Sequence, residues 1–480
     1  MVEARTAGET PVTTAPQRQA APTAPRHGPS PDEMLEAGKR LRDTVPRNAH
    51  AIWKKPASRP DPIAQLQASD AERLPELVPL RYGRMLVSPF TFYRGAAGVM
   101  AADLATTPAT GLRVQACGDC HLLNFGGFAT PERKIIFDIN DFDETLPAPW
   151  EWDVKRLAAS FVLAARSIGL SDGDGRDAAI RATRSYRKRL AEYTKMSPLE
   201  VWYASIDADA FLSLVPNAAF RKKIQRRISK ATERSGGSEM DFPTLAGMVG
   251  GQVHIHDTPP LIFHPEAARA PDFIATVETV IAAYRETLSD DRRVLLDRYR
   301  LVDAAIKVVG IGSVGRSCWI ALLMAASNDP LFLQIKEARE SVLEPYAGRS
   351  AYPHHGQRVV MGQRLMQPAS DVFLGWLTGP GGRQFYTRQL RDAKIKPLIE
   401  TFDAETLQIY GEACGWALAR SHAKAGNGWR ITGYLGGNDH FDTAMGRFAV
   451  AYADQAEADH AKLKAAVRAG TVQVMHEAEE

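Results

Sequence analysis

CGDCHLLNFGGF, residues 117–128, is the stretch that decides how the fold of this chain is interpreted. Asp119 and Asn124 stand five residues apart in it, on a predicted loop between two apolar segments. This is the spacing of a phosphotransferase catalytic loop, in which the aspartate accepts the proton of the substrate hydroxyl and the asparagine holds a magnesium ion. His121 lies between them at the predicted catalytic site. We expect it to orient the loop, because Asp119 is better placed to accept a proton.

A cluster of carboxylates follows in FDINDFDE, residues 137–144, at the end of a predicted strand. Its members are Asp138, Asp141, Asp143 and Glu144. So many carboxylates repel one another unless a cation lies among them, and Mg²⁺ is the hard, oxygen-seeking candidate. Each motif alone could be a solvated turn, but the two together favour a magnesium-dependent site.

The composition argues against several other classes of protein. The 480 residues carry a formal net charge of +3, which does not favour nucleic acid or a membrane as a main partner. Four cysteines do not make a disulfide framework in so long a chain, and they predict a cytoplasmic location. A metal or redox role is disfavoured for the Cys117 and Cys120 pair, which has no second pair at ligand spacing. It is also disfavoured for three histidines without an evident carboxylate or cysteine partner, His254, His256 and His264.

A second motif, VVGIGSVGRSCWIALL, occupies residues 308–323. It contains glycines in GxGxxG spacing, namely Gly310, Gly312 and Gly315. In a Rossmann domain such glycines end a strand, open a helix and bind the pyrophosphate of NAD, and Asp329 or Glu337 would be the ribose-binding acid.

The alternative is a kinase-like sheet, in which these glycines and Ser313 lie in a β-hairpin over the phosphates of ATP. Lys336, inside the strand-like PLFLQIKEA at 330–338, would contact the α- and β-phosphates and pair with a glutamate on the next helix. The candidate glutamates are Glu337, Glu340 and Glu344, and Glu344 is included in the predicted nucleotide site. Arg94, in FYRG, is a further candidate for clamping a phosphate.

The sequence after Lys336 favours the kinase-like interpretation. RVVMGQRLMQ, residues 358–367, predicts a strand and hinge, and residues 404–426 predict a long helix that ends in LARSHAKAG. The βαβ alternation that a Rossmann domain requires is missing.

Apolar spacing and turn residues predict the remaining elements. These are a short helix from Pro31 to Pro46, a strand or extended segment leading into a helix over 84–105, a strand, loop and hairpin over 112–142, and a helix over 150–170. Largely helical sequence then continues up to about Asp303, interrupted by glycine and proline near Ser235 to Pro265.

GDxHxxN, followed by DFDE and then by Trp152-Asp153, resembles the aminoglycoside and choline kinase branch of the protein-kinase-like fold. For single residues the resemblance implies a catalytic base at Asp119, metal ligands at Asn124 and Asp141, and a buried aspartate at Asp153 that braces the catalytic loop. The interval from Asn124 to Asp141 is longer than in that family, which leaves Asp138 as a rival metal ligand.

The motifs occur in a rearranged order, with the catalytic loop before the glycine-rich loop. The resemblance therefore implies an α+β, two-lobed, circularly permuted kinase-like fold, with a mostly helical C-lobe and a small antiparallel-sheet N-lobe. From about residue 30 the chain also resembles the bacterial domain of unknown function 2252 family, whose name implies no activity. The expected parts are a disordered tail (1–30), a helical and extended segment (31–110), the catalytic loop, metal motif and helical C-lobe (111–303), the nucleotide-binding N-lobe (304–400), and C-terminal helices (401–480).

These patterns predict an ATP- and Mg²⁺-dependent phosphotransferase that acts on a hydroxyl group of a small molecule or a protein. Three alternatives remain open from the sequence: AMP transfer at the same site, a non-catalytic nucleotide-binding regulator, and a Rossmann-type NAD-binding enzyme.

Overall fold

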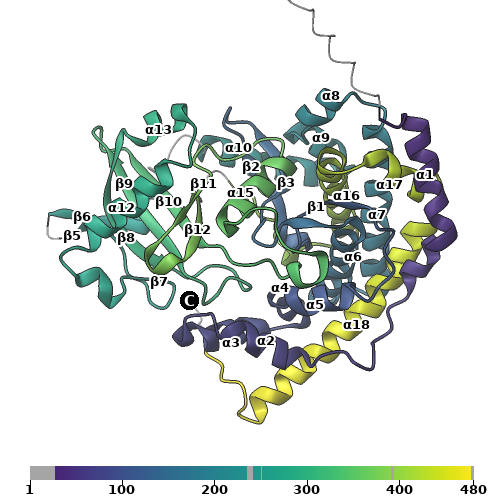
Figure 1. Cartoon of the computed structure of the whole chain (residues 1–480), viewed down its shortest axis with the longest axis horizontal. Helices are drawn as coiled ribbons and strands as arrows, with labels where there is room; N and C mark the ends of the chain where they lie inside the picture. Colours follow the sequence, from purple (N-terminus) through teal and green to yellow (C-terminus); the bar gives the residue numbers. More distant parts are fainter. Residues whose placement is uncertain (1–27, 235–241, 250, 391–393, 477–480) are drawn as a thin grey trace, which may run out of the picture.

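Helices and antiparallel strands gather in different parts of the molecule, with the main sheet on the left of Figure 1 and most helices on the right. The computed structural model describes residues 28–234, 242–249, 251–390 and 394–476, so the predicted tail lies almost entirely outside the described residues. The described chain is of the α+β class, as the sequence predicts.

The main sheet has six strands in the order β11-β12-β10-β9-β8-β7, and each neighbouring pair is antiparallel. The strands are β7 (Ile262–Phe263), β8 (Tyr299–Lys307), β9 (Cys318–Ala325), β10 (Pro330–Glu337), β11 (Gly375–Thr378) and β12 (Gln384–Gln389). Apolar side chains of the sheet pack against two helices, α12 (Phe273–Arg285) and α13 (Asp290–Leu296). We call this part the sheet region.

Four long helices form the core of the other part, which we call the helical region. They are α6 (Trp150–Ser167), α7 (Asp172–Tyr193), α16 (Ala404–Ala425) and α18 (His440–Arg468). Helix α6 lies at the centre, because every residue from Trp150 to Ala165 is buried. Helices α7 and α16 approach so closely that a Cβ at Gly415 would lie 2.0 Å from the carbonyl oxygen of Ala182, a contact that only glycine allows.

Shorter elements surround these two regions. The helices are α1 (Pro31–Thr44), α8 (Pro198–Tyr203), α9 (Ala208–Ser213), α10 (Ala218–Arg234), α11 (Phe242–Leu245), α14 (Glu344–Ala347), α15 (His355–Met366) and α17 (Gly428–Leu435). The strands form three antiparallel pairs: β1 (Arg113–Ala116) with β4 (Leu146–Pro149), β2 (Phe125–Ala129) with β3 (Ile135–Ile139), and β5 (Ala246–Val249) with β6 (Gln252–Ile255). Among the described residues, no helix is both long and apolar enough to cross a membrane.

Residues 62–104 form a set of helices that we call the cap, which lies beside α18 in Figure 1. Its helices are α2 (Pro62–Asp70), α3 (Val78–Leu86), α4 (Pro89–Gly95) and α5 (Ala97–Leu104). The C-terminal segment contacts it directly, since the N–H of Met475 donates a hydrogen bond to the carbonyl oxygen of Pro79 at 2.9 Å. The C-terminal end of the described chain therefore packs on the cap.

The strand or extended segment predicted before residue 95 is wrong, because this stretch is helical in α3 and α4. Ser88 caps α4 by accepting a hydrogen bond from the Thr91 N–H at 3.1 Å, and Pro89 takes the first helical position. Helix α4 carries the aromatic side chains of Phe92 and Tyr93, and both are buried. Capping and burial thus outweigh the preference of aromatic residues for strands.

Three further predictions differ from the structure. Residues 358–367 lie mostly in helix α15 and are not a strand and hinge, because the ring of His354 caps this helix through the Gln357 N–H and tertiary packing buries its two valines. The helix expected directly after Lys336, over residues 337–346, does not form, and the next helix, α14, spans only Glu344–Ala347. The helical sequence expected up to about Asp303 ends earlier, because β8 begins at Tyr299 and pairs with strands on both sides. The predicted N-lobe boundary at 304 therefore falls inside a strand.

The other elements are confirmed. The structure has the expected short N-terminal helix α1, the β2–β3 hairpin, and the long helices α6 and α16.

Candidate active site

The predicted catalytic loop, residues 117–124, is here called the catalytic loop. It connects β1 to β2, and Asp153 on the first turn of α6 braces it. The Asp153 carboxylate accepts hydrogen bonds from the N–H of Cys117 at 2.8 Å and of Gly118 at 3.0 Å. His422 of α16 lies 3.3 Å from the same carboxylate. The loop backbone is therefore fixed by the buried aspartate that the kinase resemblance implied.

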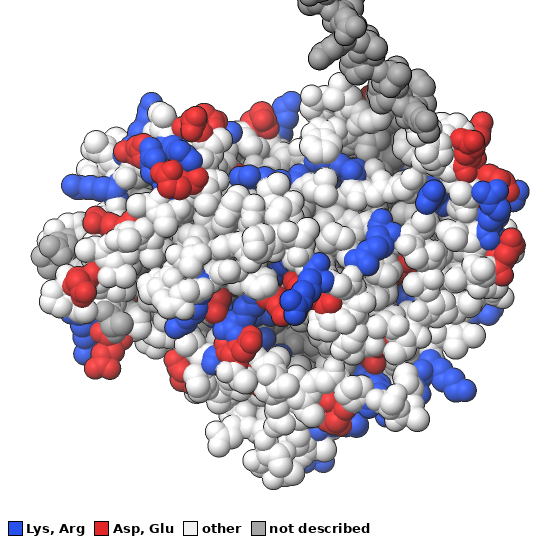
Figure 2. Space-filling model, in the orientation of Figure 1, with Lys and Arg blue, Asp and Glu red and all other residues white. Residues whose placement is uncertain are grey.

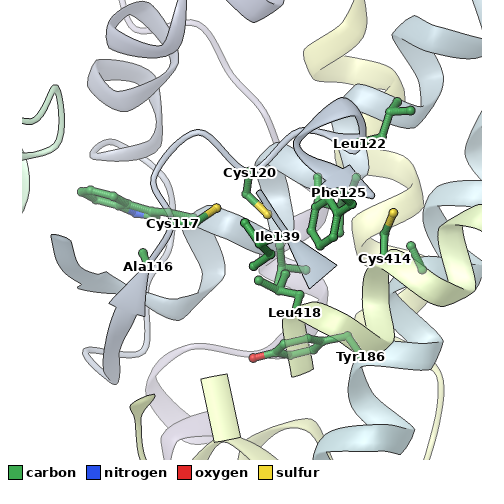
Figure 3. Packing of buried hydrophobic residues seen from close by; sticks show 14 of the residues in the cluster. Ala116, Cys117, Cys120, Leu122, Phe125, Ile139, Tyr186, Cys414 and Leu418 are labelled. Carbon is green, nitrogen blue, oxygen red and sulfur yellow. The ribbon is translucent and has the colours of Figure 1, made fainter. Parts of the chain in front are cut away.

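Apolar side chains also pack against the catalytic loop. Figure 3 shows the two cysteine side chains of the loop beside an apolar cluster that includes Leu122, Phe125, Ile139, Cys414 and Leu418. Burial raises the pKa of the Cys117 thiol well above its usual range and that of Cys120 to about 11. The two sulfurs and an oxygen of Asp153 lie within 4.8 Å of one another, as metal ligands could. Because the thiols stay protonated and Asp153 already accepts two backbone hydrogen bonds, a packing role fits these cysteines better.

Arg156, one helical turn after Asp153, fixes the side chain of Asp119. Its Nε lies 2.8 Å from Oδ1 of Asp119, and its Nη2 donates to the same oxygen. The guanidinium also covers the ring of Tyr93, 4.4 Å from the ring centroid. The Arg156 side chain is 2% exposed, whereas the Asp119 side chain is 20% exposed. One carboxylate oxygen is thus held by a buried cation, and Oδ2 is left for a ligand.

His121 lies next to this pair, with Nε2 3.9 Å from Oδ2 of Asp119. Burial, together with the positive charges of Arg94 and Arg156, lowers the pKa of His121 well below its usual range. A neutral imidazole has no additional proton to donate as a general acid. It therefore fits the predicted role of orienting the loop.

The best candidates for holding a metal ion are Asn124 and Asp141. The side-chain amide of Asn124 donates to the carbonyl oxygen of Asp119 at 2.7 Å, which leaves its own carbonyl oxygen available. Asp141 forms no ion pair with any described residue, and burial next to Asp143 raises its pKa. Such uncompensated oxygen ligands suit Mg²⁺.

Asp143, by contrast, is already neutralised. Its Oδ2 lies 2.6 Å from Nζ of Lys336, and its Oδ1 accepts a hydrogen bond from the Tyr386 hydroxyl at 2.5 Å. These two contacts lower the pKa of Asp143 below its usual range despite its burial. Asp141 is therefore the better metal ligand of the two.

Two predicted site residues lie elsewhere. Asp138 points away from the other acids and pairs at 2.7 Å with Arg420 of α16, and both side chains are at most 1% exposed. Asp138 lies within β3, where successive side chains point to opposite faces, whereas Asp141 and Asp143 follow the end of the strand. Asp138 therefore need not face the same side as they do. Glu344 does not reach Lys336. It accepts hydrogen bonds from the backbone of Ser341 and Ser350, because the helix expected to carry it towards the lysine does not form.

The glycine-rich loop, residues 308–317, connects the antiparallel strands β8 and β9, and no helix begins within it. The strand, turn and helix that a Rossmann domain requires are therefore absent here. Arg73 of the cap donates hydrogen bonds to the carbonyl oxygens of Gly312 and Val314. The Ser313 hydroxyl donates to Asp143 at 3.3 Å, and Arg316 lies 3.3 Å from Glu144. The glycine-rich loop thus contacts the acidic motif, residues 141–144, through Ser313 and Arg316.

Lys336 lies on β10, and its partner is Asp143 rather than a helix glutamate. Asp143 raises the pKa of Lys336 above its usual range in spite of burial. The lysine is therefore fully charged and is held at the acidic motif.

One cavity of about 380 Å³ lies between the catalytic loop, the acidic motif, the glycine-rich loop and the cap. The predicted residues that line it are Arg94, Asp119, His121, Asn124, Asp141, Asp143, Gly310, Gly312 and Ser313. Lys336 lies behind Asp143, and Gly315 packs against Arg73. Acidic and basic side chains also lie next to one another near the middle of the face in Figure 2.

Sequence reasoning missed three residues at this site. Arg156 could have been found, since it follows Asp153 by one helical turn and so faces the same loop. Arg316 and Tyr386 gave no such signal, because they meet the acidic motif only through the pairing of distant strands.

Outside the cavity, two of the three histidines, His254 and His264, have carboxylate partners that the sequence did not reveal. Nδ1 of His254 lies 3.3 Å, and Nε2 of His264 3.2 Å, from Oδ2 of Asp303, and His264 also contacts Asp257 at 2.8 Å. These contacts join β6 and β7 to β8.

Comparison with known proteins gives one result. A family model described as "Uncharacterized protein conserved in bacteria (DUF2252)" matches residues 73–466, well over half of the chain. No curated protein and no solved structure matches this chain. The matched range begins at Arg73 and contains the catalytic loop, both acidic and glycine-rich motifs, and Lys336.

Proposed function

This chain belongs to the bacterial DUF2252 family, and we propose that it is an ATP- and Mg²⁺-dependent phosphotransferase that acts on a hydroxyl acceptor. The observation that carries the proposal is the shared cavity. Asp119, Asn124 and Asp141 line it together with Gly310 and Gly312, although the two groups are far apart in the sequence. A candidate base, metal ligands and a phosphate-binding loop are the parts that phosphoryl transfer requires.

On the nucleotide side, charged groups are already in place. The carbonyl oxygen of Asn124 and the carboxylate of Asp141 would hold Mg²⁺, and bound Mg·ATP would supply the phosphoryl group and a compensating divalent charge. Lys336 and Arg316 carry the positive charge beside the glycine-rich loop. Asp143 and Glu144 pair with these two cations, and the nucleotide phosphates would compete with these carboxylates for them.

On the acceptor side, Asp119 is the proposed base. Its Oδ2 would accept the proton of the acceptor hydroxyl, while Arg156 holds Oδ1 and so fixes the direction of the carboxylate. Because phosphoryl transfer depends mainly on positioning and charge, this fixed orientation is the main contribution of Arg156.

The arrangement around α16 supports the proposed permuted kinase-like fold, with the sheet region as N-lobe and the helical region as C-lobe. Arg420 and His422 near its end contact Asp138 and Asp153, and Gly426 forms a bridge with Val114 just before the catalytic loop. In the kinase-like arrangement, this helix would continue directly into the catalytic loop. Here α16 ends beside the loop, whereas β1 precedes the loop in the chain. A cytoplasmic location remains a prediction from the cysteine content.

The proposal is tested by incubating the protein with Mg·ATP and a panel of hydroxylated small molecules, and measuring ADP and AMP. We expect ADP release that depends on the acceptor and that falls by about 10²- to 10⁴-fold in Asp119→Asn. Asp177→Asn, an exposed aspartate on α7, is the matched control and should keep full activity.

Release of AMP in place of ADP would point to AMP transfer. Equal rates for the wild type and Asp119→Asn would contradict the assignment of the base.

A further inference from the structure

The cap forms much of the cavity wall on the side of Asp119. Helices α2, α4 and α5 line it, together with three cap arginines, Arg73, Arg81 and Arg94. Small and apolar side chains, such as Leu66, Gly98 and Val99, make up a large part of this wall. The motifs and the cap thus bound the cavity on two sides, and we call this cavity the chamber.

Buried ion pairs hold the cap in place. Nε of Arg59 lies 2.7 Å from Asp103 at the end of α5, and its Nη1 donates to Asp459 of α18 at 2.8 Å. These three side chains are 2–3% exposed, and the Tyr452 hydroxyl donates a further hydrogen bond to Asp103 at 2.7 Å. Contacts this deeply buried are costly to break. The cap is thus a fixed wall, and a chamber of about 380 Å³ suits a small molecule rather than a protein segment.

Four arginines line the chamber, and three of them are engaged by acceptors. Arg73 donates to two carbonyl oxygens of the glycine-rich loop, Arg81 pairs with Asp70 at 2.7 Å, and Arg316 pairs with Glu144. The fourth is different.

Arg94 forms no ion pair and no side-chain hydrogen bond with any residue in the described ranges, and its buried Nε has no hydrogen-bond partner there. Burial lowers the pKa of Arg94, and the charges of Asp119 and Glu400 offset this only in part, so an anion that contacts the guanidinium directly would be stabilising. Its backbone carbonyl oxygen would lie 3.5 Å from a Cβ at Gly312, which puts the residue next to the glycine-rich loop.

We propose that the chamber binds a small anionic acceptor, a hydroxylated molecule whose phosphate or carboxylate group is held by Arg94 while its hydroxyl faces Asp119. This inference rests on the proposed function. Lys336, Arg316 and the metal ion would serve the phosphates of the nucleotide, so that Arg94 is left for the second substrate. A planar guanidinium is well matched to two oxygens of such a group.

The test uses inorganic phosphate as the probe and calorimetric titration as the measurement. Phosphate is titrated into the protein alone and into the protein saturated with Mg²⁺ and a non-hydrolysable ATP analogue, which occupies the γ-phosphate position. We expect phosphate to bind in both cases, and about ten- to a hundredfold more weakly to Arg94→Met, which keeps the aliphatic length of the side chain. Arg292→Met, an exposed arginine on α13, should bind phosphate like the wild type.

If the analogue excludes phosphate and Arg94→Met loses the preference for ATP over ADP, Arg94 serves the γ-phosphate and the acceptor assignment is overturned. Phosphate binding that is absent in the wild type, or unchanged in Arg94→Met, overturns it as well. A protein that binds phosphate through Arg94 but shows no ATP binding would contradict the proposed function alone. Circular dichroism and the melting temperature of Arg94→Met confirm that the variant is folded.

Discussion

The catalytic loop and the glycine-rich loop face the same cavity but are held in different ways. Asp153 and Arg156, both nearly inaccessible to solvent, fix the catalytic loop from inside the helical region. Polar contacts on two sides hold the glycine-rich loop. Ser313 and Arg316 contact the acidic motif, and Arg73 of the cap donates hydrogen bonds to the carbonyl oxygens of Gly312 and Val314. Nucleotide phosphates in the cavity would compete with Glu144 for Arg316. One wall is therefore preformed, and the other is set in part by contacts that substrate binding can replace.

The largest effect is expected from breaking the preformed wall at the buried pair of Arg420 and Asp138. Arg420→Met leaves the Asp138 carboxylate buried without its cation, and we expect the free energy of unfolding to fall by about 3–5 kcal/mol in urea denaturation. The double variant Arg420→Met with Asp138→Leu should recover most of this loss, because no uncompensated charge remains. If the single variant is as stable as the wild type, the pair does not fix this wall.

Two glycines with positive φ angles compare the walls directly. A Cβ at Gly118, at φ +84°, would lie 2.4 Å from the carbonyl oxygen of Glu144, whereas a Cβ at Gly310, at φ +67°, would meet nothing within 4 Å. We expect Gly118→Ala to lower the free energy of unfolding by about 3 kcal/mol or more, from strain and overpacking together. Gly310→Ala should lower it by only about 1–2 kcal/mol, from strain alone. Equal losses in urea denaturation would show that the two loops are equally constrained.

A smaller effect is expected from Ser313→Ala, which removes the hydrogen bond from the glycine-rich loop to Asp143. Because the bond is long and partly exposed, the free energy of unfolding should fall by at most about 1 kcal/mol. Hydrogen exchange of the loop amides should nevertheless become faster, while exchange in the catalytic loop stays unchanged. Faster exchange in both loops would mean that they open together.

The smallest effect concerns the sheet region and depends on pH. Contacts with Asp303 and Asp257 raise the pKa of His264 to about 8, above its usual value of 6.5. The folded state thus binds the proton more tightly, so the stabilisation is fully present below about pH 6.5 and is lost as the pH rises through 8. We expect the stability difference between the wild type and His264→Asn to shrink between pH 6 and pH 9, by under about 1 kcal/mol, because Asp257 is solvent-exposed. A pH-independent difference in urea denaturation would contradict this assignment.

Local patterns in the sequence predicted the parts of the site that lie close together in the chain. The spacing of Asp119 and Asn124, and the apolar stretches beside them, predicted the loop and the β2–β3 hairpin. The glycines followed by Lys336 in an apolar run predicted antiparallel strands around the glycine-rich loop. These features depend on turn residues and periodicity, which a single sequence carries.

The remaining features depend on contacts between distant segments. The sequence offers four acids near one another. Only the structure shows that Asp138 pairs with Arg420, Asp143 with Lys336 and Glu144 with Arg316, whereas Asp141 forms no ion pair with a described residue. Likewise, the aromatic residues before position 95 favour strands by themselves, and the burial of α4 against the helical region overrides this preference. Partner choice and tertiary burial are therefore what a single sequence did not provide.

The central claim is most directly tested by calorimetric titration of the protein with ATP, with and without Mg²⁺. We expect binding that requires Mg²⁺ and that is at least about tenfold weaker in Asp141→Asn, since this change removes the charge of the proposed metal ligand. Asp177→Asn should bind like the wild type. Absence of ATP binding at millimolar concentration, or equal binding by the wild type and Asp141→Asn, would contradict the account.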